Sequence, residues 1–482
     1  MRRVVIIGGG FSGSAVAVQL VRRSLVALDI TVIEPRARIG GGLAYGSDEP
    51  DHRLNGQPGM HSVDPTDPGL FARWCEEGGA FAADPGARLA DGTAFMRRAT
   101  FRAFLEDTVR QHSAWPTGSS IRHLQGSAVD VVPDARGMTV LTADGSAVAC
   151  DLVVLACGHT RARLPANFGS GLSDHPRVIA DPLAAPRLPA VPATDRVLIL
   201  GSGLTAYDAA STLLSAGHRG AIDMVSRRGL RPRPQRPPPA PGAPAPPPML
   251  ERVAARPERF ILDAGHPPTV RGLLRAVRRR IRAAEQEGKT WDDPFDHLRD
   301  MAAQVWPPLA VAEKRRFFRQ LRTWYDVHRF RVPPQNSAIV HAAEQRGQVR
   351  LRACAIQSVE AVGAGAPLRI ALRPRGATGV ETMVYDRVIN CTGVDATHAA
   401  DVPLIAALRA RGLISVDPSG VGLAVDVHCC ALDRNAHADA RLRSVGPPTL
   451  GARGAPHGSA FIAIQIHHMI AHILQELPGS DR

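Results

Sequence analysis

The stretch that decides the fold is Val4-Val5-Ile6-Ile7 followed by Gly8-Gly9-Gly10-Phe11-Ser12-Gly13. A short apolar run, glycines at the first, third and sixth positions of a turn, and a helix-compatible run form the fingerprint of a dinucleotide-binding βαβ unit. In such a unit the diphosphate lies at the helix N-terminus. A second apolar run, Ile30–Ile33, ends in Glu34, which lies 21 residues beyond Gly13 and is suited to bind ribose hydroxyls. We predict that this turn binds FAD.

The same pattern recurs as Val197-Leu198-Ile199-Leu200 followed by Gly201-Ser202-Gly203-Leu204-Thr205-Ala206. Counting the same 21 residues from Ala206 reaches Arg227, which is followed by Arg228 where an NAD site would carry an acid. Guanidinium groups bind a 2′-phosphate in a bidentate manner, so NADPH is favoured over NADH. A solvated arginine pair is the alternative. The residues predicted to contact NADP are Gly201, Gly203, Leu204, Thr205, Ala206, Arg227 and Arg228.

Apolar runs that end in glycine recur along the chain, as expected of buried parallel strands. They are Val4–Gly8, Leu152–Gly158, Val197–Gly201, Val388–Gly393 and Leu442–Gly446. We predict an α/β fold with two Rossmann-like dinucleotide-binding domains, in which the nicotinamide domain is inserted in the FAD domain. The predicted boundaries are 1–190 for the first part of the FAD domain, 191–385 for the NAD(P)-binding domain and 386–482 for the C-terminal part of the FAD domain.

Two further segments interrupt the predicted NAD(P)-binding domain. Ten of the eighteen residues from Arg231 to Pro248 are proline, which predicts an exposed loop or linker or, alternatively, a ligand for a proline-recognition module. Residues 250–335 then contain three amphipathic helical patterns, the first of which places arginines opposite Val270, Leu274 and Val277. This helical insertion is either a structural cap or a lid that sets substrate choice.

The composition excludes several classes of function. The net charge of +13 comes from arginines spread along the whole chain, so we expect no nucleic-acid partner. None of the seven cysteines forms a C-x-x-C motif, which counts against the disulfide reductases and favours a reducing compartment. Without a leader-like or membrane-spanning apolar run, we expect a cytoplasmic protein with no membrane partner. A homodimer is left open.

A glycine-rich stretch beyond the ribose acid adds a more specific signal. It runs Gly40-Gly41-Gly42-Leu43-Ala44-Tyr45-Gly46, followed by Asp51-His52-Arg53-Leu54-Asn55, Met60 and Val63-Asp64. It resembles a family of FAD/NAD(P)-binding flavoproteins with a G-x-G-x-A-Y-G segment and then an L-N element. The resemblance continues through Gly201–Thr205, Trp324–Arg329, Ile389–Gly393 and Val445–Pro447.

This resemblance implies a fold like that of the flavin-containing and N-hydroxylating monooxygenases, of which some characterised relatives are nitrosuccinate-forming N-oxygenases acting on aspartate. One departure concerns Gly446-Pro447, where many related flavoproteins carry Gly-Asp to bind the flavin ribityl chain. The backbone amide of Gly446 could still serve there. The residues predicted to contact FAD are Gly8, Gly10, Phe11, Ser12, Gly13, Glu34, Pro35, Gly42, Leu43, Asn55, Met60, Val129, Cys157, Gly158 and Gly446.

Catalytic residues are harder to identify, because a flavin enzyme uses its side chains mainly to position substrate and exclude water. Asn55 and Gln57 are amide candidates for the flavin face. The histidines His52, His61, His328 and His457 are acid, base or orienting candidates, with a structural role as the alternative. Arg329 and Arg331 would clamp an acidic substrate or form helix-end ion pairs. No zinc-binding spacing is present around His428-Cys429-Cys430 or His468 and His472, so no metal is predicted.

Two nucleotides without a redox dithiol indicate hydride transfer from NADPH to FAD and then electron transfer to an acceptor. The leading hypothesis is a monooxygenase that N-oxygenates a small amine or amino acid. A reductase or dehydrogenase that uses a non-oxygen acceptor is the second hypothesis. The third is a nucleotide-responsive binding protein, in which the Pro-rich loop and the helical insertion form a partner surface.

Overall fold

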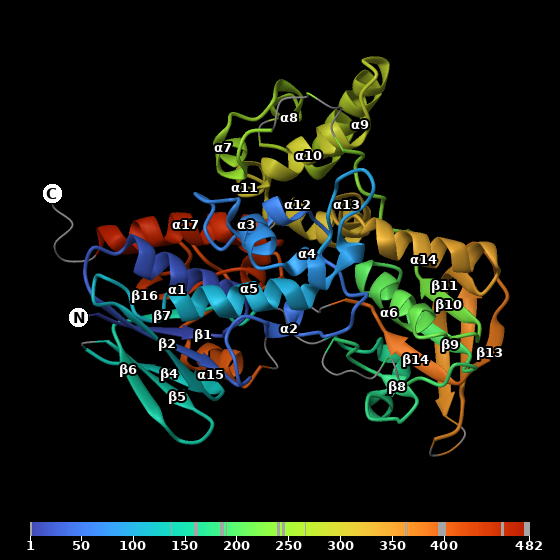
Figure 1. Ribbon diagram of the computed structural model, residues 1–482, viewed down its shortest axis with the longest axis horizontal. Helices are drawn as coiled ribbons and strands as arrows, with labels where there is room; N and C mark the ends of the chain where they lie inside the picture. The colour runs from blue at the N-terminus through green and yellow to red at the C-terminus, as the bar shows by residue number, and fades with distance from the viewer. Residues whose placement is uncertain are drawn as a thin grey trace.

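The computed structural model describes residues 2–476 except 136, 159–161, 184–187, 189, 239–241, 243–245, 266, 362, 364, 394–401, 455 and 456. Two sheet-based halves lie side by side, and a group of helices lies above them (Figure 1). The two halves are called here the FAD half and the nicotinamide half, after the predictions made from the sequence.

The FAD half is built on a six-stranded sheet with the order β15-β16-β7-β1-β2-β3. All its strands are parallel to their neighbours except β15, which pairs with β16 in the antiparallel sense. The strands are β1 (Arg2–Ile7), β2 (Leu28–Glu34), β3 (Ser120–Gln125), β7 (Leu152–Leu155), β15 (Cys430–Leu432) and β16 (Ala438–Ser444).

Both faces of this sheet are covered, which explains why its central strands are apolar throughout. Val4 and Ile6 pack against the helices α1 (Phe11–Arg23), α5 (Arg98–Gln111) and α17 (Ser459–Gln475). Val5 and Ile7 face a second cluster, which contains α15 and a three-stranded antiparallel sheet. The elements on that face are α15 (Pro403–Arg411), β4 (Ala128–Pro133), β5 (Met138–Thr142) and β6 (Ala147–Cys150).

The nicotinamide half is built on a seven-stranded sheet with the order β13-β12-β11-β10-β9-β14-β8. Five of its strands are parallel, and an antiparallel pair, β12 and β13, extends one edge. The strands are β8 (Val178–Ile179), β9 (Val197–Leu200), β10 (Ile222–Ser226), β11 (Val349–Ala361), β12 (Leu368–Pro374), β13 (Glu381–Tyr385) and β14 (Arg387–Asn390). Helices α6 (Leu204–Ser215) and α14 (Pro334–Gln345) pack together above it.

The predicted insertion of one dinucleotide-binding unit in the other is confirmed, because the chain forms β8 to β14 between β7 and β16. The sheet does not divide at the predicted boundaries of 190 and 385, however. β14 pairs with β9 through Val388 and Leu198, and β8 pairs with β14, so both strands belong to the nicotinamide sheet. A four-residue apolar run does not reveal which of two neighbouring parallel sheets it joins.

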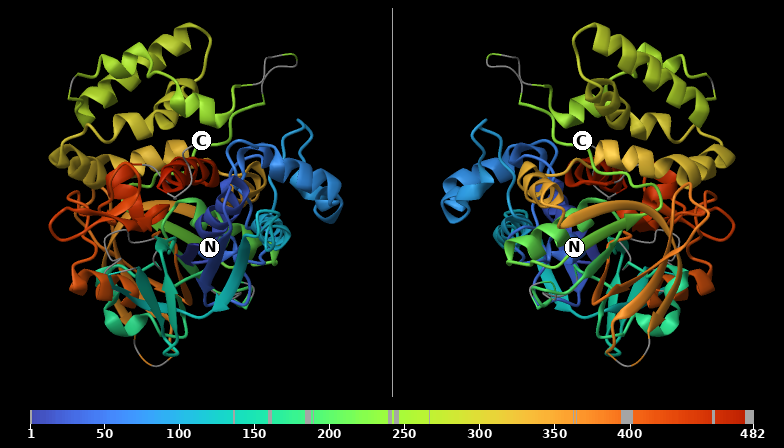
Figure 2. Two further views of the ribbon diagram at one scale, coloured as in Figure 1. Left: turned by 90° about the vertical axis from the view of Figure 1, so that its left-hand side faces the viewer. Right: turned by 90° about the vertical axis from the view of Figure 1, so that its right-hand side faces the viewer.

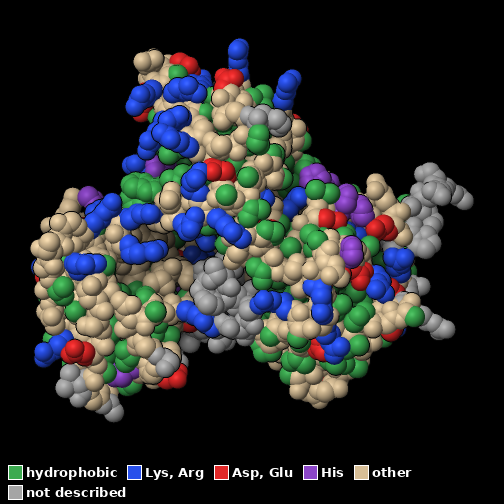
Figure 3. All heavy atoms as spheres, turned by 180° about the vertical axis from the view of Figure 1, so that it is seen from behind, with side chains coloured by type: hydrophobic (Ala, Val, Ile, Leu, Met, Phe, Trp, Pro, Cys, Tyr) green, Lys and Arg blue, Asp and Glu red, His purple; other side chains and the backbone are tan. Residues whose placement is uncertain are grey.

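The helical insertion lies above both halves (Figures 1 and 2). Its elements are α7 (Met249–Ala254), α8 (Arg259–Leu262), α9 (Val270–Gln286), α10 (Asp292–Asp300), α11 (Ala302–Val305), α12 (Val311–Arg316), a π-helical turn (Phe317–Leu321) and α13 (Arg322–Arg329). The predicted amphipathic pattern of α9 is confirmed, since Val270 and Val277 are buried and its arginines face outward. Lys and Arg side chains accordingly gather over this part of the surface (Figure 3).

Although it is inserted in the nicotinamide half, the helical insertion is anchored to the FAD half. The buried Trp306 donates its indole N–H to the carbonyl oxygen of Gly451 at 2.7 Å. A Cβ atom on Gly454 would lie 2.3 Å from the Trp306 ring, so the indole packs directly against this glycine. Arg315 also donates to the carbonyl oxygen of Pro418 at 2.7 Å. The insertion therefore forms a roof over the C-terminal part of the FAD half.

The Pro-rich segment 231–248 contains neither helix nor strand in its described part. Pro234 forms an isolated bridge with Val332, and Gln235 donates to the carbonyl oxygens of Asn55 and Arg331 at 2.9 and 3.2 Å. The start of this segment thus lies between the FAD half and the base of the insertion. No helix among the described residues is long and apolar enough to cross a membrane.

Candidate dinucleotide-binding sites

The first glycine turn connects β1 to α1, and its geometry requires glycine. Gly8 has φ +105°, and a Cβ atom there would lie 2.5 Å from the carbonyl oxygen of Ala156. A Cβ atom on Gly13 would lie 1.9 Å from the carbonyl oxygen of Gly8, so α1 packs closely on the turn. The helix begins after Gly10, and no side chain caps it. Its first-turn N–H groups are thus suited to bind an anion.

The predicted ribose acid lies directly beneath this turn. Glu34 ends β2, is only 3% exposed and accepts a hydrogen bond from the N–H of Gly9 at 2.8 Å. Its other carboxylate oxygen accepts from both the backbone N–H and the guanidinium of Arg36, each at 3.0 Å. The carboxylate is therefore held in one orientation at the carboxyl end of the second strand, and the oxygen bound to Gly9 retains acceptor capacity.

The second glycine-rich stretch, Gly40–Gly46, packs on the first turn backbone to backbone. The N–H of Gly40 donates to the carbonyl oxygen of Gly9 at 2.7 Å. Gly42 has φ +53°, and a Cβ atom on it would lie 2.8 Å from the Cα atom of Gly10. The helix α2 (Gly42–Tyr45) begins at this contact. The motif that carries the family resemblance is thus a structural neighbour of the dinucleotide turn.

Several other predicted FAD contacts follow the carboxyl ends of the same strands or lie in adjoining loops. Pro35 follows β2, Cys157 and Gly158 follow β7, Leu43 belongs to α2, Val129 lies at a bulge in β4, Asn55 lies in the loop after α2, and Met60 ends the short 3₁₀ helix Pro58–Met60. Burial raises the pKa of the Cys157 thiol to about 12, so this side chain is not a thiolate at neutral pH. Met60 is 44% exposed.

The structure places Gly446 against the first turn, because a Cβ atom there would lie 2.6 Å from the hydroxyl oxygen of Ser12. Its N–H group donates to the side-chain oxygen of Gln465 at 2.9 Å. Gln465 also donates to the hydroxyl of Thr449 at 2.9 Å and is 7% exposed. The amide that was expected to replace the missing acid is thus already used within the protein. Gln465 of α17 is a residue that the sequence analysis did not single out.

The four catalytic candidates lie in different environments. The carbonyl oxygen of Asn55 accepts from Gln235, whereas Gln57 is exposed. His52 is 1% exposed, its Nδ1 contacts the hydroxyl of Ser47 at 2.8 Å, and its Nε2 has no hydrogen-bond partner among the described residues. Burial lowers the pKa of His52 to about 3, so this imidazole is neutral and cannot donate a proton from a charged form at neutral pH.

The fourth candidate, Arg329, is the last residue of α13 in the helical insertion. It donates to the carbonyl oxygen of His457, and its guanidinium lies 5.0 Å from the ring centre of Phe330 and 5.1 Å from that of Phe461. Arg331, the other arginine of the predicted clamp, instead forms an ion pair with Asp296 at 2.6 Å. For Arg331 the structure thus bears out the alternative, an ion pair.

The remaining histidine candidates lie in two environments. His61 is buried, and its Nδ1 contacts the hydroxyl of Ser459 at 2.7 Å while its Nε2 lies 3.2 Å from the carbonyl oxygen of Gly56. Because a carbonyl only accepts, Nε2 carries the proton and Nδ1 accepts from Ser459. His328 packs against Trp291 in the insertion, at a centroid distance of 5.1 Å. These contacts describe orienting and packing roles.

The second glycine turn has the geometry of the first. Gly201 has φ +116°, and a Cβ atom there would lie 2.3 Å from the carbonyl oxygen of Cys391 at the end of β14. Helix α6 begins after Gly203 without a side-chain cap, and a Cβ atom on Gly203 would meet no described atom within 4 Å. Space is thus open above the helix N-terminus, where a diphosphate would approach.

The strand pairing shows that the residue equivalent to Glu34 in the second half lies one position earlier than the count along the chain predicts. Ile7 pairs with Ile33 in the FAD half and Leu200 pairs with Val225 in the nicotinamide half, so the position of Glu34 corresponds to Ser226. The count from the sequence had reached Arg227 instead. The connection between the two strands is one residue shorter in the nicotinamide half, which a count along the chain does not detect.

Ser226 replaces the acid with a neutral hydroxyl. Its oxygen accepts a hydrogen bond from the hydroxyl of Ser202 at 2.9 Å and another from the N–H of Gly229 at 3.0 Å. Arg227 is exposed and Arg228 is half-buried, and neither forms an ion pair with a carboxylate in the described part of the chain. The edge of this site is therefore positive, as a 2′-phosphate requires.

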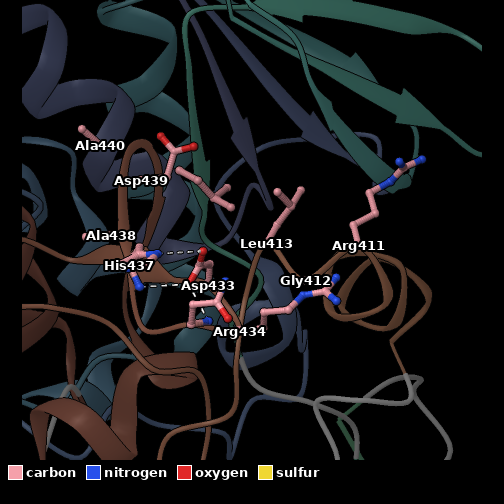
Figure 4. Close-up of a pocket in the computed structure, with 11 residues that line it drawn as sticks. Arg411, Gly412, Leu413, Asp433, Arg434, His437, Ala438, Asp439 and Ala440 are labelled. Atoms are coloured by element: carbon pink, nitrogen blue, oxygen red, sulfur yellow. Dashed lines mark hydrogen bonds and ion pairs between the residues drawn. The ribbon is translucent and has the colours of Figure 1, made fainter.

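The structure contains neither a disulfide nor a metal-binding cluster among its described residues. All seven cysteines are free thiols. No group of three or more metal-ligating side chains converges within the described ranges. A surface pocket between the end of α15 and the β15–β16 hairpin contains Arg411, Asp433 and His437 (Figure 4). It lies on the FAD half without including any predicted site residue.

The comparisons with known proteins agree with this architecture. Residues 5–160 match the model of a protein family described as FAD-NAD(P)-binding. This segment extends from β1 to just beyond β7 and includes the first glycine turn, Glu34 and Gly40–Gly46. No curated protein matches the chain in sequence.

Solved structures match along nearly the whole chain. An ornithine N-hydroxylase from Kutzneria sp. 744 has a TM-score of 0.64 at 13% identity, covering 98% of this chain and 99% of its own. An L-lysine 6-monooxygenase from Pseudomonas syringae has a TM-score of 0.64 at 16% identity with the same coverage. A thioredoxin reductase from Lactococcus lactis has a TM-score of 0.52 at 10% identity, covering 99% and 100%. The chain has the fold that these proteins share.

Proposed function

We propose that the protein is an FAD-dependent, NADPH-consuming monooxygenase that N-oxygenates a small amine or amino acid. The observation that carries this proposal is the pair of uncapped glycine turns, one backed by Glu34 and the other by Ser226 with Arg227 and Arg228 beside it. The fold shared with an ornithine N-hydroxylase and an L-lysine 6-monooxygenase supports this assignment.

In this proposal FAD binds at the first turn and NADPH at the second. The N-terminal end of α1 would hold the FAD diphosphate, while Glu34 would accept hydrogen bonds from a ribose hydroxyl. Arg227 and Arg228 would bind the 2′-phosphate of NADPH, which a carboxylate at position 226 would repel. FAD bound in this way would accept a hydride from NADPH and supply the reducing electrons for oxygen activation.

The substrate would bind between the helical insertion and the FAD half. This placement is supported by the anchoring contacts of Trp306 with Gly451 and of Arg329 with the carbonyl oxygen of His457. These contacts hold the insertion as a roof over the start of α17, where it would exclude water from the reaction. Asn55 lies at the edge of this region through its contact with Gln235. The proposal therefore treats the insertion as a lid, with a structural cap as the alternative.

A disulfide reductase is disfavoured, although a thioredoxin reductase shares the fold. Such an enzyme needs two thiols that exchange with a disulfide beside the flavin. The one cysteine that follows β7, Cys157, has a pKa raised to about 12 by burial, and all seven cysteines are free. The free cysteines also support a reducing, cytoplasmic location, which we include in the proposal.

The test is to purify the protein, identify its bound cofactor, and screen amines and amino acids for stimulation of oxygen-dependent NADPH oxidation. A substrate should yield an N-oxygenated product that carries the label when the reaction runs under ¹⁸O₂. If the protein binds no FAD, the proposal fails. A stimulated NADPH oxidation without label in any product would instead support a reductase or dehydrogenase that uses another acceptor.

A further inference from the structure

A buried ionic cluster connects the two halves of the protein. The side chain of Arg98, the first residue of α5 in the FAD half, forms an ion pair with Asp208 in α6 at 2.6 Å. The other carboxylate oxygen of Asp208 accepts from the amide of Asn336, in α14, at 3.3 Å. The same amide donates to the carbonyl oxygen of Asp51 in the FAD half at 2.8 Å. We call Arg98, Asp208 and Asn336 the interdomain cluster.

This cluster is shielded from water. The side chain of Arg98 is 16% exposed and that of Asp208 is 2% exposed, and Asn336 is 1% exposed as a residue. A buried ion pair stabilises a fold poorly compared with apolar packing, but it fixes the geometry of the groups that it joins. Removal of one partner leaves a buried charge without its counterion. Two surfaces joined in this way therefore have one strongly preferred alignment.

The interdomain cluster lies on a continuous path between the two glycine turns. Gly42 packs against Gly10 of the first turn, and Ala44, two residues later in α2, accepts a hydrogen bond from Arg98 at 3.2 Å. Asp208, at the other end of the ion pair, lies four residues after Leu204, where α6 begins at the second turn. Helix α6 begins at the second turn. One helical turn after its start, it is thus joined through Arg98 to the stretch Gly40–Gly46, which covers the first turn.

We propose that the interdomain cluster is a positioning device that holds the second turn in the alignment needed for hydride transfer. The proposal rests on the proposed function, in which a hydride leaves the dihydronicotinamide of NADPH, producing NADP⁺, and reduces FAD by two electrons. Arg98, Asp208 and Asn336 touch neither cofactor in this scheme, so they are positioning residues. Their effect is to set the distance and angle between two cofactors that the separate halves bind.

The experiment uses the full-length FAD-loaded protein and the variant Asp208→Asn, which keeps the shape of the side chain but removes its charge. The matched control is Asp195→Asn, since Asp195 pairs with Arg387 at 3.4 Å within the nicotinamide half and does not reach the FAD half. Flavin reduction by saturating NADPH is followed under anaerobic conditions by stopped-flow absorbance. Reduction by dithionite, the dissociation constant for NADPH and the thermal midpoint are measured beside it.

In Asp208→Asn, reduction by NADPH should slow by about 10- to 100-fold, because small misplacements of reacting groups have effects of this size. The dissociation constant for NADPH should change by less than about threefold, since the residues of the second turn are intact, and reduction by dithionite should be unchanged. The double variant Arg98→Gln/Asp208→Asn should be no slower than Asp208→Asn alone, because the two residues act as one unit. Equal rates in Asp208→Asn and Asp195→Asn would overturn the proposal.

Hydrogen exchange provides a readout that does not depend on the reaction. The amides of α6 and α14 should exchange faster in Asp208→Asn than in the wild type or Asp195→Asn, because the halves separate more often. Unchanged exchange in both helices would overturn the positioning role even if the protein proved to have no NADPH-dependent activity. Faster exchange in a protein that NADPH fails to reduce would contradict the proposed function while leaving the interdomain contact established.

Discussion

The two glycine turns of this protein have nearly the same backbone but differ in what lies behind them. Gly8 and Gly201 both have positive φ, and a Cβ atom on either would collide with a carbonyl oxygen of the neighbouring parallel strand. At the end of the second strand, however, Glu34 stands in one half and Ser226 in the other. In the proposed function the turn binds a dinucleotide diphosphate, and the residue at the strand end selects which dinucleotide binds.

The two turns also differ in how closely other segments of the chain cover them. Gly40–Gly46 covers the first turn, and Phe11, at the start of α1, stacks on Phe101 of α5. The second turn faces open space at Gly203. A cofactor held at the first turn would be enclosed by the protein, while one at the second turn could enter and leave. This contrast fits a resident FAD and an exchanging NADPH, as the proposed function requires.

The largest expected effect comes from closing the space between helix and turn. Gly13→Ala places a Cβ atom 1.9 Å from the carbonyl oxygen of Gly8, so α1 must shift. The protein should therefore be purified without FAD. At the corresponding position of the second turn, Ala206 is fully buried with its Cβ already accommodated. Ala206→Gly should therefore leave FAD content unchanged and cost about 1 kcal/mol of helix stability. Absorbance of the flavin released from each variant measures its FAD content. Full FAD occupancy in Gly13→Ala would refute this account of the first turn.

A smaller effect should follow from removal of the positive edge of the second turn. The double variant Arg227→Ala/Arg228→Ala should weaken NADPH binding by more than about 100-fold, since each arginine loses at least one hydrogen bond from a charged group, which contributes about 1.5–3 kcal/mol. Binding of NADH, which lacks the 2′-phosphate, should change little. Isothermal titration of both nucleotides provides the measurement, and the exposed Arg219, at the opposite end of β10, provides the control Arg219→Ala. An equal loss for NADH and NADPH would rule out phosphate recognition by this pair.

The smallest effect concerns the support of the first turn. Burial lowers the pKa of His61 to about 4, against 6.5 in the unfolded chain, so unfolding takes up a proton between these values. The contribution of neutral His61 is fully present above pH 6.5 and is lost as pH falls towards 4, by roughly 3 kcal/mol. His61→Gln should reduce this loss, whereas His437→Gln, at a side chain that is 79% exposed, should not. Urea unfolding at several pH values checks this, and parallel curves for His61→Gln and the wild type would contradict it.

Local features of the fold could be predicted from the sequence, because each strand and glycine turn is specified within a few residues. The strands before Gly8 and Gly201, Glu34 at the end of β2 and the apolar face of α9 were all identified in this way. The pairing of β8 and β14 with the nicotinamide sheet was not foreseen in the predicted boundaries at 190 and 385, because pairing partners lie far apart in the chain.

Features that depend on two distant segments were likewise missed. The residue equivalent to Glu34 was predicted one position too late, at Arg227 and not Ser226. The connection between the strands is shorter in this half, and nothing in the local sequence indicates that. Gln465 and Trp306 act through contacts with Gly446 and Gly451, which the sequence does not bring together. Asp208 gave a weak signal, since an acid within the apolar run of α6 needs a buried partner. That partner, Arg98, could not be identified without the structure.

The anchoring of the helical insertion has a mechanical consequence. The insertion is covalently continuous with the nicotinamide half but packs on the FAD half through Trp306. Any rotation of the nicotinamide half must consequently be absorbed in the two chain connections, at residues 231–248 and near Val332. Proline fixes φ, so the described start of the first connection, where Pro234 is bridged to Val332, resists compaction. This bridged start would limit the arc through which one half can swing while the roof stays in place.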